Sequence, residues 1–549
     1  MLKKLITALF FTAAVVTTNA QTKDFELTKN IDIFLNGIRE FQDLYVDSLS
    51  MEQLINYSFE GITENLDPYT EFVPAKDQED FDFQTNMRYA GIGSLIQKDS
   101  SWAIIAGPYK GFPADKAGLV AGDRILEIDG KSIEGMDLDK VSNMLRGDAN
   151  TFIKLKVLKL RTSNIEELNI ERENIRISSV PYYGMIQDGI GYIKLTGFTR
   201  NCSNDMRDAL KELRATGELK SLVLDLRTNG GGLLSEAVKI VNFFVPKGTT
   251  IVESKGRNKQ LDFKYTTMDD PIEPDLPLTI LVNGASASAS EIVSGAIQDL
   301  DRGIIIGTHT FGKGYVQSIR PLGYDAQLKI TTAKYYIPSG RCVQAHNFTT
   351  RNSDGSVAFI PDSLKKEFKT KNGRPVFDGG GVTPDVVISP EDYSPIIISL
   401  IRGNHIFRYS VDYYKKHLTI NTPDKFTLTD KEYQNFINYL SNKEYDYQTV
   451  SERSMKQLIN NAKQEKYYDN SKELFDKLNE ALKHDKVKDL KINEKEIKAF
   501  LVEELMERYY YSEGRIRASL RYDRQFNEAC DILNNPIKYS NLLQPSVKK

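Results

Sequence analysis

Two stretches in the middle of the chain show a short apolar run followed by residues with helical spacing. Residues 277–282 (PLTILV) are apolar, and apolar residues then recur at helical spacing between Glu291 and Leu300. Residues 219–226 (LKSLVLDL) form a second such run, which helical spacing over 233–241 follows. The run predicts a strand, and the spacing after it predicts an amphipathic helix. Each stretch is therefore predicted to be a strand, a turn and a helix.

The pattern differs on either side of this middle part. Strict alternation over 154–160 (KLKVLKL) predicts a strand, and a second strand is expected near 168–170. From about Pro390 onward the sequence is rich in Lys, Glu, Asn and Tyr. Helices are expected towards both ends of the chain, over 31–45, 51–66, 473–482 and 494–511.

Length and composition are typical of a multi-domain protein. With 549 residues, of which 40% are hydrophobic and 27% charged, the chain can bury more than one core, and we expect about three or four domains. The net charge of -3 gives no electrostatic reason to expect a nucleic-acid partner. Cys202, Cys342 and Cys530 are widely separated and lack metal-ligand spacing, so we expect no metal site and at most one disulfide, and favour none.

The first twenty residues have the pattern of an export signal. Lys3 and Lys4 precede an apolar run over 5–16, and residues 18–20 (TNA) lead to a cleavage point before Gln21. The apolar run is shorter than the roughly 20 residues that a membrane-spanning helix needs, which argues against a signal anchor. We therefore expect an exported protein, periplasmic if the host has an outer membrane and otherwise extracellular or associated with the cell envelope.

The segment Asn283–Glu291 (NGASASASE) places three serines at the turn before a predicted helix. Only Ser288 has a glutamate three positions later, the spacing of a capping box, so Ser288 is the predicted N-cap. The amides at a helix start can stabilise an anion that forms on a substrate carbonyl. Ser288 is thus a candidate nucleophile, and a plain helix cap is the alternative interpretation.

Lys313 is a candidate base. It lies in the glycine-rich loop Gly307–Gly314 and follows Ser288 by twenty-five residues. A lysine can activate a serine hydroxyl if its surroundings hold it neutral. Because an ordinary lysine has a pKa of about 10.4, burial must lower the pKa of Lys313. In an extended strand Lys313 and Gln317 would share a face, so the neutral glutamine could hold the amine. The alternatives are a solvated lysine and, as base, His309.

The same loop comes close to a phosphate-binding motif, with Gly307, four further residues, Gly312 and Lys313. Gly314 stands where that motif needs a hydroxyl to ligate magnesium, and the residues that follow alternate like a strand. The nucleotide-binding interpretation is therefore disfavoured.

Arg227–Gly232 (RTNGGG) is predicted to be a tight turn. Its glycines leave amides free to approach a ligand, and with the Ala289 amide they could form an oxyanion hole. Helix-to-sheet packing or a dinucleotide loop is the alternative, although three consecutive glycines lack the spacing of a dinucleotide fingerprint.

Several motifs together resemble those of the carboxyl-terminal processing (tail-specific) proteases. In order, they are 225–232 (DLRTNGGG), 286–291 (SASASE), 310–317 (TFGKGYVQ), 334–341 (KYYIPSGR) and 380–385 (GGVTPD), and residues 66–70 (LDPYT) resemble the lead-in of the same proteases. The resemblance implies Ser288 as nucleophile, Lys313 as general base, Gln317 as the residue that orients the lysine, and the amides of Ala289 and Gly231 as oxyanion hole. It also implies an α/β core of the crotonase-like or Clp-protease-like type with an inserted PDZ domain, and no cofactor.

Residues 89–96 (YAGIGSLI) resemble the carboxylate-binding loop of a PDZ domain, in which backbone amides bind the terminal carboxylate of a peptide. Residues 114–130 (ADKAGLVAGDRILEIDG) resemble the signature turn and strand of the same domain. The resemblance implies that the peptide-binding residues are Gly91, Ile92, Gly93, Ser94 and Leu95.

The predicted protein is an exported serine endopeptidase that cleaves near the C-terminus of protein substrates. Its expected parts are a signal peptide over 1–20, a helical N-terminal segment over 21–85, a PDZ domain over 86–172, a Ser-Lys peptidase core over 173–390 and a helical C-terminal domain over 391–549. The expected partners are proteins or peptides with free C-termini, and an adaptor protein and a homodimer are left open. The other classes are a PDZ scaffold without catalysis and an acyl-transfer or thioester-handling enzyme. Ser288 and Lys313 count against the first, and the PDZ domain and export signal against the second.

Overall fold

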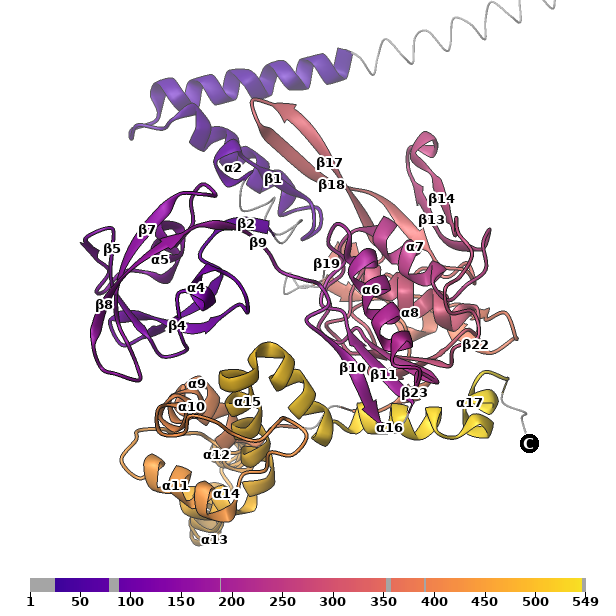
Figure 1. The fold of residues 1–549 in the computed structure, drawn as a ribbon. Helices are drawn as coiled ribbons and strands as arrows, with labels where there is room; N and C mark the ends of the chain where they lie inside the picture. Colours follow the sequence, from indigo (N-terminus) through magenta and orange to yellow (C-terminus); the bar gives the residue numbers. More distant parts are fainter. Residues whose placement is uncertain (1–24, 79–87, 188, 352–356, 390–391, 546–549) are drawn as a thin grey trace, which may run out of the picture. The chain divides into compact units, whose positions relative to one another are not determined.

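The computed structural model describes residues 25–78, 88–187, 189–351, 357–389 and 392–545 (Figure 1). The chain divides into two compact units. The N-terminal unit comprises Met1–Phe81, Val316–Thr332 and Phe348–Val357, and the main unit comprises the rest of the chain. The predicted signal peptide lies outside the described residues. In the part of the chain that the structure describes, none of the helices combines the length and apolar character needed to cross a bilayer.

The N-terminal unit contains the two helices that the amphipathic pattern predicts. One helix covers residues 25–44, and α2 covers Met51–Thr63. α2 begins at a reciprocal cap, in which Ser50 Oγ accepts from the Gln53 amide and Gln53 Oε1 accepts from the Ser50 amide. This cap satisfies two amides that would otherwise lack an intrahelical partner.

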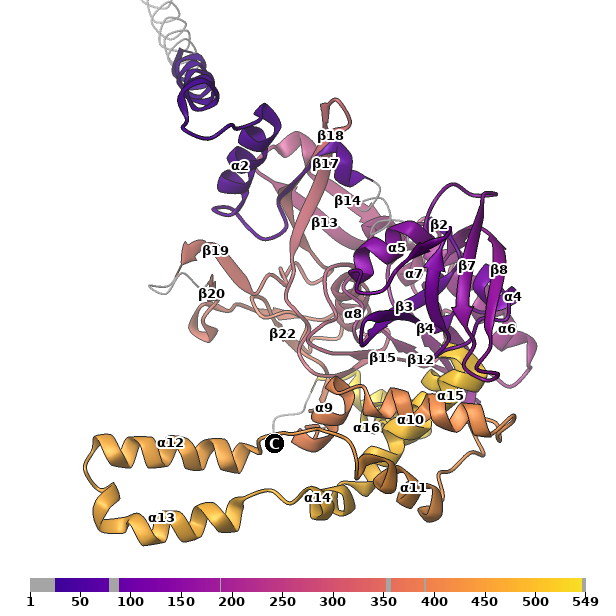
Figure 2. The same cartoon turned by 90° about the vertical axis from the view of Figure 1, so that its left-hand side faces the viewer.

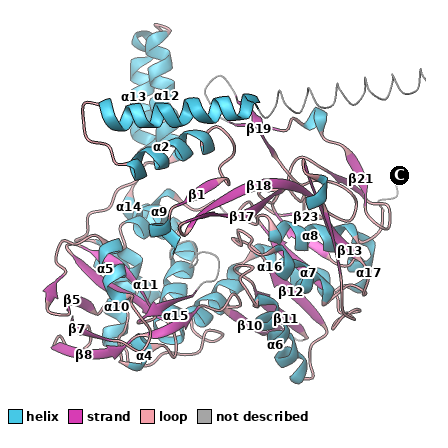
Figure 3. Cartoon of the chain, turned by 90° about the horizontal axis from the view of Figure 1, so that it is seen from above, coloured by secondary structure: helices cyan, strands magenta, loops and turns pink. Residues whose placement is uncertain are grey.

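The strands of the N-terminal unit continue into a long ribbon. β1 (Glu71–Val73) pairs antiparallel with β18 (Ala326–Tyr336), and β17 (Tyr315–Gly323) pairs with β18 as well. Figure 3 shows β17 and β18 as adjacent long strands. Phe72 of β1 stacks on Phe59 of α2 with a ring-centroid distance of 4.2 Å. This aromatic contact holds β1 against the helix.

A six-stranded sheet forms the centre of the main unit. Its strand order is β10 (Tyr182–Gln187), β11 (Ile190–Lys194), β12 (Ser221–Asp225), β15 (Leu278–Val282), β16 (Ile304–Gly307) and β23 (Val386–Val387). β10 is antiparallel to β11, and the other neighbouring pairs are parallel. Every residue of β12, β15 and β16 is buried, as expected for parallel strands covered by helices. The strands predicted from the apolar runs are confirmed.

Helices from distant parts of the chain cover this sheet. α6 (Cys202–Ala215), α7 (Leu234–Asn242) and α8 (Ala289–Asp299) lie together (Figure 1). α16 (Arg524–Leu533) joins an apolar cluster with Tyr192 of β11 and residues of β12, β15 and β16. The carboxyl-terminal part of the chain therefore contributes to the core around this sheet.

The predicted PDZ region forms a separate sheet in the order β3, β4, β5, β7 and β8, with β6 paired to β5. These elements are β3 (Ser94–Asp99), β4 (Trp102–Pro108), β5 (Arg124–Ile128), β6 (Lys131–Ser132), β7 (Phe152–Leu158) and β8 (Ile165–Glu171), with helices α4 (Pro113–Lys116) and α5 (Leu138–Leu145). β7 and β8 confirm the two strands predicted there. β2 (Arg88–Gly91) pairs with β9 (Glu173–Arg176) where the chain enters and leaves the region.

Smaller strand pairs complete the α/β part. β13 (Thr250–Gly256) pairs antiparallel with β14 (Phe263–Thr266) and with the Ala333–Tyr336 end of β18. Two short pairs are β19 (His346–Arg351) with β20 (Val357–Phe359), and β21 (Glu367–Lys369) with β22 (Pro375–Phe377).

The carboxyl-terminal region is helical, as predicted. Before α16 it contains α9 (Pro395–Arg402), α10 (His405–Lys416), α11 (Asp430–Leu440), α12 (Val450–Gln464), α13 (Tyr468–Leu482), α14 (Lys486–Ile492) and α15 (Glu494–Ser519), and α17 (Pro536–Leu542) follows. Figure 2 shows α12 and α13 as neighbouring helices that run in opposite directions. α15 is kinked at Tyr510 and Tyr511, where the backbone leaves the helical region. All three cysteines are free thiols.

Candidate active site

The three serines in the turn between β15 and α8 differ in burial and in their hydrogen bonds. Ser286 Oγ donates to the Leu226 carbonyl and Ser290 Oγ to the Asn229 carbonyl, each at 2.8 Å, and both serines are fully buried. Ser288 alone among the three is partly exposed. Ser286 and Ser290 therefore brace the turn, and Ser288 is the serine that a substrate can reach.

Ser288 is the N-cap of α8, as predicted, and has an unusual backbone conformation, with φ 56° and ψ -112°. A non-glycine residue in such a region costs roughly 1–3 kcal/mol, so the surrounding structure has to hold it. The Ser288 amide donates to Glu291 Oε2 at 2.8 Å, and its carbonyl accepts from the amides of Glu291 at 2.8 Å and Ile292 at 3.0 Å. The helix start thus fixes Ser288 in its partly exposed position.

Glu291 joins this helix start to the loop that carries Lys313. Glu291 Oε2 accepts from the amides of Ser288 and Lys313, each at 2.8 Å, and Oε1 accepts from Thr310 Oγ1 at 2.6 Å and the Gly312 amide at 2.7 Å. Burial raises the pKa of the Glu291 carboxyl group, and these hydrogen bonds oppose the shift. Because one oxygen holds both amides, the backbones of Ser288 and Lys313 lie next to each other.

Lys313 lies in the glycine-rich loop, as the sequence predicts, and outside the strand that follows. β17 begins two residues after the partly buried Lys313, and the residues before it have no regular structure. The physical reason is that side chains take the amides of this loop. Glu291 accepts from Lys313, and Gln344 Oε1 accepts from Gly314 at 2.8 Å, so these amides cannot join a strand ladder.

Glycines are required on both sides of Lys313, as the sequence indicates. Gly312 has φ +84°, and a Cβ there would overlap Ala345; a Cβ at Gly314 would lie 2.8 Å from the Gln344 amide nitrogen. A side chain at either position would push the loop away from its neighbours.

Gln317 belongs to the N-terminal unit. Its Nε2 donates to Thr331 Oγ1 at 3.1 Å, and Thr331 Oγ1 in turn donates to Asp67 Oδ1 at 3.1 Å. Asp67 also accepts from the amides of Tyr69 and Thr70, at 2.9 and 3.0 Å. The lead-in segment over 66–70 therefore supports Gln317 through Thr331, a link that the sequence analysis did not identify.

Gly231 and Ala289, the predicted oxyanion-hole residues, lie together beside Ser288. Gly231 has φ +104°, and a Cβ there would lie 2.8 Å from Ser288 Cβ and 3.1 Å from the Ala289 nitrogen. As the first residue of α8, Ala289 has an amide without an acceptor inside its own helix. The Gly231 amide donates to Asn229 Oδ1 at 2.9 Å, so it is engaged within its own turn.

A buried ionic network holds the end of β12, just before the glycine turn. Asp225 accepts from the Tyr192 hydroxyl at 2.7 Å and pairs with Arg227 at 2.7 Å and Lys194 at 3.1 Å. Burial alone would raise the pKa of Asp225, but Arg227 and Lys194 hold it below its usual value. Arg227 also pairs with Asp523 at 2.6 Å, which ties the carboxyl-terminal helices to the catalytic core.

The predicted peptide-binding loop connects β2 to the edge strand β3. Gly91 ends β2, Gly93 has φ +70°, and Ser94 and Leu95 begin β3. The Leu95 side chain is 51% exposed, whereas Ile92 is 2% exposed and belongs to the PDZ core. An edge strand can accept an added strand through its backbone groups. The geometry fits a peptide that binds along β3.

His309, the alternative base, has Nδ1 3.3 Å from Thr383 Oγ1. Burial lowers the pKa of His346, whose ring lies 4.4 Å from that of Phe359. Since Lys313 shares an acceptor with Ser288, the backbone geometry favours the lysine over His309.

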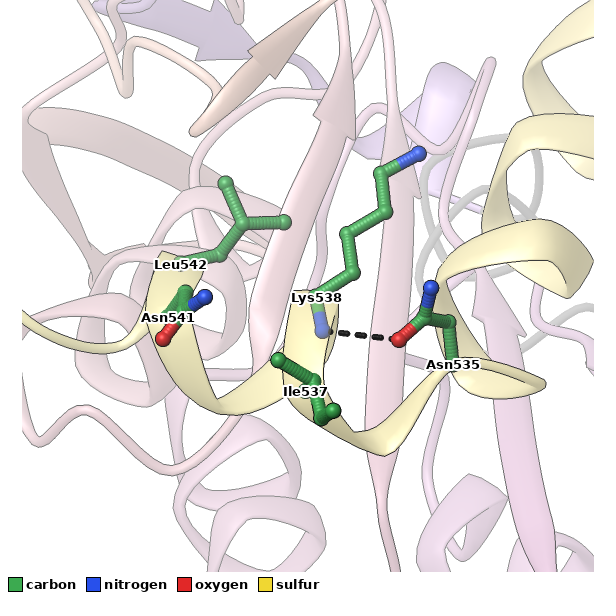
Figure 4. Close-up of a pocket in the computed structure, with 5 residues that line it drawn as sticks. All are labelled: Asn535, Ile537, Lys538, Asn541 and Leu542. Atoms are coloured by element: carbon green, nitrogen blue, oxygen red, sulfur yellow. Dashed lines mark hydrogen bonds between the residues drawn. The ribbon is translucent and has the colours of Figure 1, made fainter.

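A surface hollow lies at α17, away from these elements in the sequence. It is lined by Asn535, Ile537, Lys538, Asn541 and Leu542 (Figure 4). The Lys538 amide donates to Asn535 Oδ1 at 3.0 Å at the start of the helix. None of the predicted catalytic or peptide-binding residues lines this hollow.

Comparisons with known proteins agree with this organisation. Residues 189–351 match the model of peptidase family S41, residues 104–159 a PDZ domain, and residues 396–533 the C-terminal helical domain of a probable PDZ-protease. The carboxy-terminal-processing protease of Bartonella bacilliformis is 35% identical over 339 residues, which cover 61% of this chain and 76% of the relative. A probable CtpA-like serine protease of Staphylococcus aureus is 34% identical over 345 residues, covering 62% and 68%.

Among solved structures, the photosystem II D1 C-terminal processing protease is 27% identical and covers 65% of this chain and 86% of its own, with a TM-score of 0.36. The matched domains define a serine-type peptidase that carries a PDZ domain. The chain belongs to peptidase family S41, together with the carboxy-terminal-processing proteases to which it is similar.

Proposed function

We propose that Ser288 and Lys313 carry out the peptidase reaction. Lys313 Nζ takes the Ser288 hydroxyl proton as Oγ attacks the carbonyl carbon of the substrate. The tetrahedral intermediate then expels the amine, which receives the proton from Lys313, and leaves an acyl group on Ser288. Water attacks this ester with the same lysine as base; as the ester bond breaks, the lysine gives that proton to Ser288 Oγ, and the new C-terminus is released. The observation that carries the proposal is the shared acceptor Glu291 Oε2, which holds both backbones at 2.8 Å.

The oxyanion hole proposed here consists of the Ala289 and Gly231 amides. Both lie beside Ser288, and preorganised amides stabilise the developing negative charge. In this proposal the substrate oxyanion replaces Asn229 Oδ1 as the acceptor for Gly231. Gln317 orients the lysine amine, and Thr331 and Asp67 support Gln317 in turn.

The PDZ domain is proposed to select substrates by their C-termini. Amides of the loop over 91–95 bind the terminal carboxylate, and the peptide adds to the edge strand β3. The α/β core is proposed to be of the crotonase-like or Clp-protease-like type, on the basis of its parallel sheet and strand–turn–helix units. The pattern of residues 1–20 supports export, to the periplasm if the host has an outer membrane.

A homodimer through the helices of the N-terminal unit is part of the proposal. Large apolar side chains are exposed along them, among them Phe25 at 65%, Leu27 at 62%, Ile33 at 60% and Leu44 at 74%. A monomer rarely leaves such a surface uncovered. An adaptor protein that delivers substrates is a second proposed partner. If a homodimer is needed, the specific activity of the purified protein should rise with its own concentration. If an adaptor is needed, the activity should rise when lysate fractions are added.

Peptide hydrolysis by the purified protein tests the catalytic proposal. A peptide with an unstructured, apolar C-terminus should be cleaved, and its C-terminal amide should be bound and cleaved more weakly. Ser288→Ala and Lys313→Ala should each remain folded and lose several powers of ten in rate, as members of one catalytic unit do. Lys313→Arg should also be inactive, because a guanidinium group does not deprotonate in a protein. Substantial activity in any of these variants would reject the assigned roles.

A further inference from the structure

Tyr335 is a buried tyrosine that touches both proposed catalytic residues. It lies in the part of β18 that belongs to the main unit, opposite Ser254 of β13, and is 1% exposed. Its amide donates to the Gly314 carbonyl at 3.0 Å. The strand therefore holds the tyrosine backbone against the residue that follows Lys313.

The Tyr335 hydroxyl lies between two backbone carbonyls. It is 2.7 Å from the Lys313 carbonyl oxygen and 3.1 Å from the Ser288 carbonyl oxygen. A phenolic hydroxyl has one proton to donate, and the shorter distance marks the Lys313 carbonyl as its main acceptor. The Ser288 carbonyl, which already accepts from two amides of α8, shares the same proton more weakly.

Glu291 and Tyr335 hold complementary groups of the same two residues. Glu291 accepts from the amides of Ser288 and Lys313, and Tyr335 donates towards their carbonyls. The peptide groups on both sides of Lys313 are therefore held, although no regular structure surrounds the residue. Glu291 is in the first turn of α8, whereas Tyr335 is in strand β18.

We infer that Tyr335 is a positioning residue for the peptidase reaction, whose hydroxyl sets the separation between the Ser288 and Lys313 backbones. The inference rests on the proposed roles of Ser288 and Lys313. Tyr335 acts through the backbone of both residues and takes no proton from the substrate. Its role is distinct from that of Glu291, because it restrains the carbonyl side of the loop.

The expected effect follows from the geometry of the lysine. Its amine lies at the end of four methylene groups, so a small change of backbone position moves the base relative to the serine hydroxyl. A misplacement of about 1 Å in a catalytic group can reduce the rate by about a hundredfold. Without the hydroxyl, the Lys313 carbonyl loses a bonding partner, although the carbonyls of Gly312 and Gly314 still accept from the amides of Ala345 and Tyr335.

The first test is Tyr335→Phe, which removes the hydroxyl and keeps the ring. We expect kcat to fall about 10- to 100-fold, whereas KM should change less than about twofold because a residue this buried does not contact the peptide. Tyr336→Phe is the matched control. Tyr336 is the next residue on the same strand, where side chains alternate between faces, and its ring lies 5.0 Å from Lys255 Nζ. This control should keep kcat and KM within about twofold of the wild type.

A pair of non-standard residues separates positioning from packing. At position 335, 4-aminophenylalanine retains a hydrogen-bond donor where the hydroxyl was, and 4-methylphenylalanine has a similar size without one. The amino variant should recover at least about a third of wild-type kcat, and the methyl variant should resemble Tyr335→Phe. If packing alone mattered, the two would have the same kcat.

The outcomes separate this inference from the proposed function. An active Ser288→Ala variant rejects the catalytic assignment and the inference with it. An inactive Ser288→Ala variant together with wild-type kcat in Tyr335→Phe rejects only the role of Tyr335. Loss of near-UV circular dichroism in Tyr335→Phe, or equal kcat in the amino and methyl variants, would show that the residue serves folding or packing and would also overturn the inference.

Discussion

Replacing Glu291 by glutamine should separate the organisation of the active site from the stability of the fold. The substitution keeps the shape of the side chain and replaces one oxygen by an NH2 group, which cannot accept a hydrogen bond. Each carboxylate oxygen accepts two bonds, from Ser288 and Lys313 on one side and from Thr310 and Gly312 on the other. At least one backbone amide must therefore face the new NH2 group.

The less costly orientation of the glutamine keeps its oxygen towards Ser288 and Lys313. Thr310 can then turn its hydroxyl, and the Gly312 amide is left unpaired, which costs about 1–3 kcal/mol. Removing a buried charge offsets part of this cost, because burial raises the pKa of Glu291 and so opposes its ionisation. The free energy of unfolding should fall by no more than about 3 kcal/mol. Meanwhile kcat should fall about 10- to 100-fold, since the lysine loop shifts.

Urea denaturation and steady-state peptide hydrolysis measure the two effects in the same preparation. Glu236→Gln is the matched control, because Glu236 is also buried in the first turn of a helix and accepts from the amide and hydroxyl of Ser203. It should lower stability comparably and leave kcat within about twofold of the wild type. A Glu291→Gln enzyme with wild-type kcat would refute the claim that Glu291 aligns the two residues.

Three further substitutions test other parts of the molecule. Asp67→Asn weakens the support of Gln317 and should reduce kcat by about three- to tenfold in hydrolysis assays. Phe526→Ala removes a ring that is 1% exposed in the catalytic sheet cluster and should lower the free energy of unfolding by about 3–5 kcal/mol. Burial raises the pKa of Glu503 to about 7 from 4.5. Its contribution to stability is therefore fully present below about pH 4.5 and is lost as the pH rises to about 7, so Glu503→Gln should raise stability at pH 8 by about 1–3 kcal/mol.

Each of these predictions has a control. Asp77→Asn changes an exposed carboxylate of the same N-terminal segment and should leave kcat unchanged. Ile537→Ala removes a side chain that is 74% exposed on α17 and should shift stability by less than about 0.5 kcal/mol. For Glu503→Gln, the control is a measurement at about pH 4. There the Glu503 carboxyl group is mostly protonated in both the folded and the unfolded state, so the variant and the wild type should have the same free energy of unfolding. An equal gain at pH 4 and pH 8 would contradict the burial argument.

Much of the active site was predictable because its parts are local in sequence. The apolar run over 277–282 and the spacing after it define β15, the turn and α8, and the glutamate three residues after Ser288 identifies the N-cap. The side-chain partners of that glutamate were not predictable in the same way. Thr310 and Gly312 are 19 and 21 residues away in the chain, and periodicity does not encode which loop returns to a helix start.

The omissions have a common physical cause. The loop before β17 was predicted from its glycines, but the side-chain acceptors that take its amides were not. The bond between Thr331 and Asp67 joins residues 264 positions apart. The helical pattern over 494–511 was correct in type, yet a kink at Tyr510 and Tyr511 occurs where the two hydroxyls donate to the Ile420 carbonyl and Asp115. Tertiary hydrogen bonds decided each case.

Covalent labelling with a fluorophosphonate tests the central claim most directly, because the reagent reports an activated serine without requiring a peptide substrate. The wild-type protein should acquire one adduct, which peptide mapping locates on Ser288, and Ser288→Ala should acquire none. Lys313→Ala should react at least about a hundredfold more slowly while remaining folded. An adduct on Ser286 or Ser290, or an unchanged labelling rate in Lys313→Ala, would contradict the account.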